Sequence, residues 1–293
     1  MKVILAVSAA TGALIMAGCS DGAMASVQYS SQSTSTSSGD GHYRFEQDGD
    51  VSLIGSDMSV EGRIGGDLSL IGSDLDVSAE IGGEMSLVGS DIGFDGSVGR
   101  GASLAGSDIE WIGTSGGDVD IAGSDVEWSG RADGSLSIAG SDISVDGDVG
   151  GALEIAGSDI ILTAGSRVGR DLSIAGSDLL VHGDVVGDAD LVGSSIGISG
   201  EIDGRVLAIA YSRRGWSWSS NNSHQRIRIE GAIGEGSAVC ARRVEIGADA
   251  NISGTLAVFA EDAPVIAAGG PQNINFEEIG DHDCDELLEP YDN

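Results

Sequence analysis

The sequence repeats a Gly-Ser-Asp triplet at a nearly constant spacing, and this periodicity constrains the fold more than any other feature. The triplet occurs nine times, the last time as Gly-Ser-Ser, and successive copies are 17 residues apart except for one spacing of 19 residues. A fixed short period indicates that one small structural unit is stacked repeatedly along an axis. The copies begin at Gly55, Gly72, Gly89, Gly106, Gly123, Gly140, Gly157, Gly176 and Gly193.

Within each repeat, aliphatic residues alternate with small or polar ones, as at Leu68, Leu70, Leu75 and Val77. Alternation at period two over a few residues, interrupted by glycine, is typical of short half-buried strands. Glycine suits the corners between such strands because it accepts positive φ angles. We therefore predict an all-β fold, a single-stranded right-handed parallel β-helix (β-solenoid) with about 17 residues per coil and about 11–12 coils. The extra residues of the 19-residue spacing, around 163–167, are expected to form a bulged corner.

Aromatic residues enter one column of the repeat, at Phe94, Trp111 and Trp128. Four residues after each tryptophan, where other repeats carry an aliphatic residue, the sequence has Ser115 or Ala132. A close-packed interior requires such volume compensation, whereas exposed tryptophans would not. We predict an internal aromatic ladder. The alternative is an exposed aromatic strip that binds carbohydrate.

The N-terminus has the features of an export signal. Met1–Gly18 contains an early lysine and an apolar stretch too short to span a bilayer. The segment ends in Met16-Ala17-Gly18-Cys19, which resembles a bacterial lipoprotein cleavage box. That resemblance implies that Cys19 is lipidated and, because Ser20 follows it, that the protein is anchored in the outer membrane through its lipid. The alternative is an ordinary secretory signal with an incidental cysteine.

The remaining chain divides by composition and periodicity. Residues 19–50 are rich in Ser and Gly and are expected to form a disordered tether. The β-solenoid is expected at 51–260, with an insertion loop at 211–225, and an acidic C-terminal tail at 261–293. An exported chain meets an oxidising environment, so Cys240 and Cys284 either form a disulfide that joins the tail to the last coils or stay free.

The net charge of −33 makes nucleic acid an improbable partner, because phosphate binding requires a basic face. Stacked coils would align the Asp residues of the triplets about 4.8 Å apart, where like charges repel. We expect each carboxylate to accept a hydrogen bond from a corner N–H. The alternative is a line of cation sites that hold calcium. The column comprises Asp57, Asp74, Asp91, Asp108, Asp125, Asp142, Asp159 and Asp178.

The sequence does not indicate a catalytic function. There is no nucleophile elbow between a strand and a helix, no His-Glu-x-x-His and no phosphate-binding glycine loop before a helix. We expect no catalytic residues and no resident cofactor. The insertion loop carries the one basic and aromatic cluster, at Arg213, Arg214, Trp216 and Trp218, residue types that dominate binding hot spots. It is either a partner-binding loop, for an envelope protein or a glycan, or a disordered surface insertion.

The spacing of glycine and aliphatic residues in the coils resembles that of bactofilin-type polymer-forming proteins and of adhesin β-strand-repeat proteins of bacterial envelopes. An example is Val145-Asp146-Gly147-Asp148-Val149-Gly150-Gly151. The resemblance covers about residues 51–260 and implies a non-enzymatic scaffold that can self-associate through its coil ends. The chain departs from bactofilins in its export signal, acidity and long tail. We therefore expect a lipid-anchored structural, scaffolding or adhesin-like envelope protein. A bactofilin-like polymer and a polysaccharide-binding or polysaccharide-processing β-helix are the alternatives.

Overall fold

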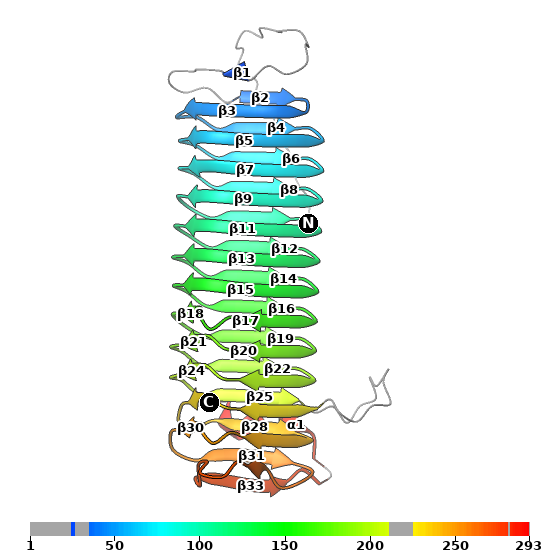
Figure 1. Cartoon of the computed structure of the whole chain (residues 1–293), viewed down its shortest axis with the longest axis vertical. Coiled ribbons are helices and arrows are strands. Elements are labelled where there is room, and N and C mark those ends of the chain that lie inside the picture. Colours follow the sequence, from blue (N-terminus) through cyan, green and yellow to red (C-terminus); the bar gives the residue numbers. More distant parts are fainter. Residues whose placement is uncertain (1–24, 27–34, 211–224, 281, 293) are drawn as a thin grey trace.

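The computed structural model describes residues 25–26, 35–210, 225–280 and 282–292. In this part of the chain the polypeptide winds into a β-solenoid of about 13 turns with almost no helix (Figure 1). The predicted all-β parallel solenoid with a spacing of about 17 residues is confirmed, with more turns than expected, and its right-handedness stays a prediction. At about 4.8 Å per turn, the stack is about 60 Å long. No described helix is long and apolar enough to cross a membrane.

Two parallel sheets form the walls of the solenoid (Figure 1). The short-strand sheet contains β2 (Ser35–Ser38), β4 (Val51–Ile54), β6 (Leu68–Ile71), β8 (Met85–Val88), β10 (Ala102–Ala105), β12 (Val119–Ala122), β14 (Leu136–Ala139), β16 (Leu153–Ala156), β19 (Leu172–Ala175), β22 (Ala189–Val192), β25 (Val206–Ala210), β28 (Ala238–Ala241), β31 (Leu256–Ala260) and β33 (Ile274–Glu278).

The long-strand sheet contains β1 (Ala25–Ser26), β3 (Gly41–Gln47), β5 (Asp57–Ile64), β7 (Asp74–Ile81), β9 (Asp91–Val98), β11 (Asp108–Ser115), β13 (Asp125–Ala132), β15 (Asp142–Val149), β17 (Asp159–Leu162), β18 (Arg167–Val168), β20 (Asp178–Val181), β21 (Asp184–Val185), β23 (Ser195–Ile198), β24 (Glu201–Ile202), β26 (Arg226–Ile229), β27 (Ala232–Ile233), β29 (Arg243–Ile246), β30 (Asn251–Ile252) and β32 (Val265–Ile266). After the strands come α1 (Cys284–Leu288) and a 3₁₀ turn, η1 (Glu289–Tyr291).

Four of the eight-residue strands, β5, β11, β13 and β15, have a glycine with positive φ as their sixth residue. Gly130 has a φ of +142°, and a Cβ added there would lie 1.9 Å from the carbonyl oxygen of Gly113 on the previous turn. Only a residue without a side chain accepts both this backbone angle and this close approach. These glycines let the backbones of successive turns approach closely.

The core is one continuous stack of buried aliphatic ladders with an aromatic insert. Trp111 and Trp128 are 0% and 1% exposed, and the ring of Phe94 lies 4.4 Å from that of Trp111 between centroids. Ser115 and Ala132, which compensate for the tryptophan volume, are also buried. The predicted internal ladder is confirmed, and the alternative of an exposed carbohydrate-binding strip is wrong.

The 19-residue spacing is absorbed by a turn at Ala164–Gly165. Leu162 pairs with Val145 and Arg167 pairs with Asp148, so the two extra residues lie between them. The buried hydroxyl of Ser166 donates to the carbonyl of Val145 at 2.8 Å. The same carbonyl accepts the N–H of Thr163 at 3.0 Å, so two bonds tie the bulge to the previous turn.

The solenoid extends beyond 51–260 at both ends. The expected disordered tether to residue 50 is wrong for 41–47, because β3 pairs in register with β5 and buries Phe45 and Gln47. The expected tail from 261 is also wrong as a purely solvated segment. It supplies β32 and β33 to the two sheets, and it buries Ile279, Cys284 and Leu288.

Candidate functional site

Several residues singled out from the sequence lie outside the described part of the chain. These are the lipidation candidate Cys19 and the loop residues Arg213, Arg214, Trp216 and Trp218. The candidate surfaces that the structure does describe are the aspartate column at the Gly-Ser-Asp corners and the outer face of the short-strand sheet.

The aspartates of the triplet form an in-register column along one edge of the long-strand sheet. Asp57 pairs with Asp74, Asp74 with Asp91, and the series continues to Asp178 with every side chain exposed. The corner N–H groups do not bond to these carboxylates. Ser73 N and Asp74 N, for example, donate to the carbonyl of Ser56 at 2.8 and 2.9 Å. The expected carboxylate caps are therefore wrong, because the backbone of the previous turn already satisfies these donors.

Neighbouring carboxyl groups raise the pKa of particular members of this column. Side-chain hydrogen bonding, first with Asp57 and then with Asp91, raises the pKa of Asp74 to about 6 from its ordinary value of 3.8. Hydrogen bonding with Asp91 and Asp125 likewise raises the pKa of Asp108. A contact between two carboxyl groups is a hydrogen bond only when one of them is protonated. Asp74 and Asp108 thus bind protons more readily than isolated aspartates do.

A long acidic groove runs beside the column on the long-strand sheet, with a volume of about 910 Å³. Its walls are the column residues from Asp57 to Asp125 and a second row with Asp76, Glu110 and Glu127, and no Lys or Arg lines it. Within the described ranges, no group of three or more His, Cys, Asp or Glu side chains is arranged to hold a metal ion. The groove is therefore an acidic surface feature without the geometry of a metal site.

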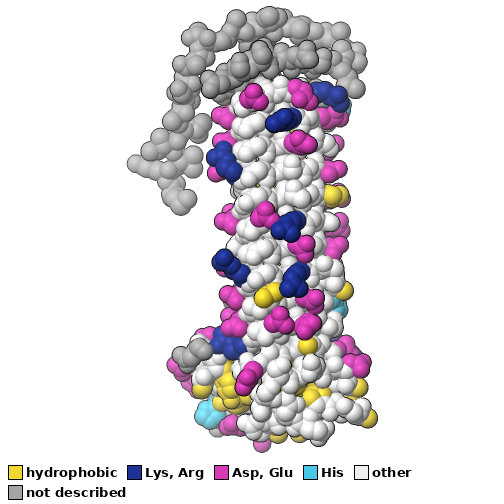
Figure 2. Space-filling model, turned by 90° about the vertical axis from the view of Figure 1, so that its left-hand side faces the viewer, with side chains coloured by type: hydrophobic (Ala, Val, Ile, Leu, Met, Phe, Trp, Pro, Cys, Tyr) yellow, Lys and Arg dark blue, Asp and Glu magenta, His cyan; other side chains and the backbone are white. Residues whose placement is uncertain are grey.

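A second acidic column, which sequence reasoning missed, does cap backbone groups. It lies at the corner before each short strand, where the Oδ1 atom of Asp50 accepts the N–H of Asp67 at 2.9 Å. The Oδ1 atoms of Asp118 and Asp171 accept bonds from residues 17 positions later in the same way. The signal was present in the sequence as a recurring Asp before the first aliphatic residue of a repeat. Figure 2 shows how acidic side chains, interspersed with a few arginines, follow the rod along one of its faces.

One segment has the spacing of a nucleophile elbow without its structure. Gly113-Thr114-Ser115-Gly116-Gly117 matches Gly-x-Ser-x-Gly, but Ser115 is 2% exposed and its hydroxyl donates to the carbonyls of Arg100 and Gly117. It ends a strand and is not followed by a helix. Ser115 therefore lacks the exposure that a nucleophile requires.

The C-terminal tail folds back onto the outer face of the short-strand sheet. A disulfide joins Cys240 of β28 to Cys284 of α1, with 5.7 Å between their Cα atoms. Around it, Leu288 of the tail packs in a cluster with Leu207 and Phe259 of the sheet. This second apolar cluster lies outside the main core. It explains why β28 and β31 are apolar on both faces.

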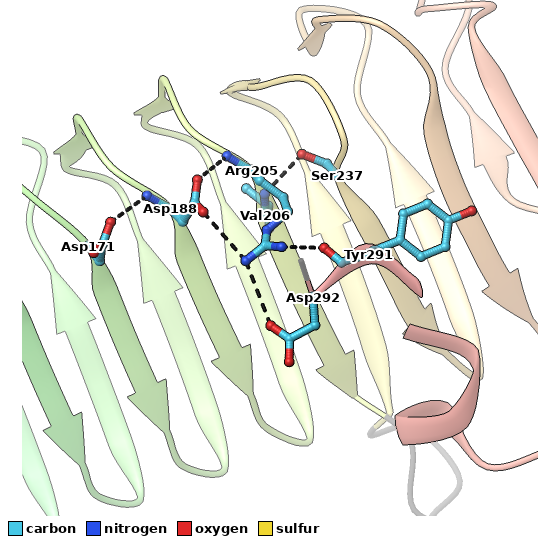
Figure 3. A network of polar contacts seen from close by, with 7 residues as sticks. All are labelled: Asp171, Asp188, Arg205, Val206, Ser237, Tyr291 and Asp292. Carbon is cyan, nitrogen blue, oxygen red and sulfur yellow. Dashed lines mark hydrogen bonds and ion pairs between the residues drawn. The ribbon is translucent and has the colours of Figure 1, made fainter. Parts of the chain in front are cut away.

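An arginine fixes the end of this tail (Figure 3). Arg205 stands in the second acidic column, where its N–H donates to Asp188 Oδ1 at 2.8 Å. Its guanidinium donates to the carbonyl of Tyr291 and lies 3.4 Å from Asp188 Oδ2 and 3.8 Å from Asp292 Oδ1. The Arg205 side chain is 17% exposed, so these charges interact in a partly dehydrated setting.

No protein-family model matches the chain, and no curated protein or solved structure is significantly similar to it. The resemblance to bactofilins and adhesin repeat proteins therefore stays a prediction from the coil sequence.

Proposed function

We propose that the chain is a non-enzymatic, lipid-anchored structural protein of the bacterial envelope, an acidic rod used for scaffolding or adhesin-like display. The observation that supports this proposal most is the regularity of the stack. From β3 to β25 the turns stay in register, and the corners between strands hold few residues. β-Helix enzymes need side chains gathered from breaks in such regularity, and 41–210 offers only the small bulge at 163–166.

The experiment has two arms. In a bacterium with an outer membrane, the natural chain is expected in the outer-membrane fraction and Cys19→Ser in the soluble periplasmic fraction, because acyl chains supply the anchoring. Electron microscopy of the purified Cys19→Ser chain is expected to show single rods about 60 Å long. A cytoplasmic location, or unchanged membrane fractionation of Cys19→Ser, contradicts the proposal.

A polymer-forming scaffold is the second candidate, because the last turn exposes apolar residues at an unpaired sheet edge. Val265 is 60% exposed, Ile266 36% and Phe276 39%. Unpaired strand edges with apolar side chains are templates for pairing with another chain. Acidic Glu277 and Glu278 beside them oppose end-to-end contact. Filaments in the same micrographs, growing as salt screens the charges, would favour this candidate over the single rod.

A further inference from the structure

An apolar strip runs along the outer face of the short-strand sheet from β4 to β31, at one in-register position that is the fourth residue of most of these strands. It begins with Ile54, Ile71 and Val88, continues through alanines, and ends with Ile209, Cys240 and Phe259. In-register pairing sets these side chains about 4.8 Å apart in a single file. We call this file the outer strip.

At its C-terminal end the outer strip is covered by the tail of the same chain. Leu287, Leu288 and Tyr291 pack against this part of the sheet, and the ring of Tyr291 meets Phe259 edge-on at 6.1 Å. The strip becomes exposed at Val192, next to the edge of the tail. Val192 is 51% exposed, and together with Leu288 it lines a small pocket. The molecule thus shows that a short amphipathic helix docks on the strip.

At its N-terminal end the outer strip is bare as far as the described residues are concerned. Ile54 is 55% exposed, Ile71 49% and Val88 45%. The other outward residues of β4, β6 and β8 are serines, so this part of the face carries no charge. Three adjacent branched aliphatic side chains on a flat, uncharged face are the kind of apolar patch that marks an interaction surface.

The charges that border the strip differ between its two ends. At the C-terminal end the docked tail is acidic, with Asp285, Glu286 and Asp292, and the corner column there carries Arg205. At the N-terminal end the same column carries Asp50, Asp67 and Glu84. The opposite corner carries the carboxylates of Asp57, Asp74 and Asp91. Arg100 neutralises only part of this charge, through its ion pair with Asp67 at 2.6 Å.

We propose that the bare end of the outer strip, formed by Ile54, Ile71 and Val88 between two acidic corners, docks a cationic amphipathic segment of a partner protein. Aliphatic side chains of that segment cover the strip, and its Lys or Arg residues reach the carboxylates on either side. Charge complementarity selects this occupant, because the acidic tail of a second copy and an anionic lipid surface are both repelled. The site is independent of the structural role proposed above.

The test uses the full Cys19→Ser chain and a fluorescent amphipathic helix of about 18 residues, with leucines on one face and lysines on the other. Binding is measured by anisotropy at about 0.15 M salt, where distant charges are screened. Ile71→Ser is expected to weaken binding about tenfold, because it removes a buried aliphatic side chain from the complex. The matched control is Ala139→Ser, an exposed position in the middle of the same strip, which is expected to bind as the parent does.

Four results would overturn the proposal. Equal affinity of Ile71→Ser and Ala139→Ser would show attraction to the acidic rod alone. If a helix of leucines and glutamates binds as tightly as the helix of leucines and lysines, the partner segment does not need to be cationic. If light scattering detects a dimer of the parent chain that Ile71→Ser dissociates, the occupant is a second copy of this chain. Co-sedimentation with phosphatidylcholine vesicles that depends on Ile71 would make it a lipid surface. Ile71 is half exposed, so both variants are expected to fold as the parent does, and circular dichroism checks this.

Discussion

The turns from β4 to β16 and the turns from β25 to β31 share the same two sheets but differ on the outer face of the short strands. In β6 the outward residues are Ser69 and Ile71, and Ile71 is half exposed. In β31 the outward residues are Ala257 and Phe259, and both are buried. A strand that is apolar on both faces must be covered on both faces. The loss of alternation therefore marks the place where the chain returns to cover its own surface.

The two regions also differ in charge. The column that begins with eight aspartates continues as Ser195, Arg226 and Arg243 in the last turns. Half of the 14 basic residues lie between positions 205 and 243 of the sequence. These are Arg205, Arg213, Arg214, Arg226, Arg228, Arg242 and Arg243. The pairing of Arg242 with Glu261 at 2.9 Å and the Arg205 network show how this charge is used to hold the tail.

The largest expected effect is on the free energy of unfolding, when a substitution in the interior of the regular turns is compared with one on their surface. Trp111→Ala is expected to lower the free energy of unfolding by about 3–5 kcal/mol, because it leaves a large cavity in a close-packed stack. Ile112→Ala, at the adjacent exposed position, is expected to change it by less than about 0.5 kcal/mol. Urea unfolding measures both. Similar losses for the two variants would contradict the internal ladder.

Removing the disulfide tests whether the stability of the last turns depends on the C-terminal tail that covers them. The double variant Cys240→Ser/Cys284→Ser is expected to lose about 2–4 kcal/mol, because the closed loop spans 44 residues. Hydrogen exchange is expected to accelerate in β25, β28 and β31 but not in β6 to β14. Exchange that accelerates equally along the whole rod would contradict a local cover.

The Arg205 network is expected to contribute less than the disulfide. Arg205→Ala removes a guanidinium that is 17% exposed and leaves Asp292 and the Tyr291 carbonyl without their partner. We expect a loss of about 1–3 kcal/mol. Arg131→Ala is the control, because its ion pairs are more than half exposed and such pairs contribute about 0–1 kcal/mol. Equal losses in thermal unfolding would show that the tail does not need Arg205.

The smallest expected effect is a pH dependence confined to the regular turns. The pKa of Asp74 is raised in the folded chain to about 6 from an ordinary value of 3.8, so the folded state binds protons more tightly than the unfolded state between these values. Stability contributed by this group is therefore fully present below about pH 3.8 and is lost as pH rises through about 6.

The melting temperature is accordingly expected to rise on acidification from pH 7 to pH 4. Asp74→Asn should raise it at pH 7 and reduce its change with pH. Asp95→Asn, at an exposed position whose neighbours on adjacent strands are Ser78 and Ile112, should leave the profile unaltered. A profile that Asp74→Asn does not alter would show that the column carries no shared protons.

The repeat could be predicted from the sequence because every partner of a core residue lies one period away. Leu70 meets Leu87 and Trp111 meets Trp128 for that reason alone. The role of the corner aspartates could not be predicted in the same way. Asp57 and Asp50 are both turn residues in the sequence, yet only Asp50 accepts a bond from a backbone N–H of the next turn. Which donors stay free depends on the backbone path through each corner.

The ends of the solenoid escaped prediction for a different reason. Tyr43, Phe45 and Gln47 keep the inward alternation but lack the Gly-Ser-Asp marker, so they resemble the polar segment before them. The tail has no period at all, and its position is fixed by Cys284, Leu288 and residues far earlier in the chain.

The sequence by itself therefore determined the solenoid, its period and the interior place of its tryptophans, since contacts one repeat apart are encoded locally. Only the tertiary structure decided which corner carboxylates accept backbone N–H groups and where the tail covers the sheet. The free donors at a corner depend on the backbone path of the stacked turns, and the tail contacts join residues with no periodic relation.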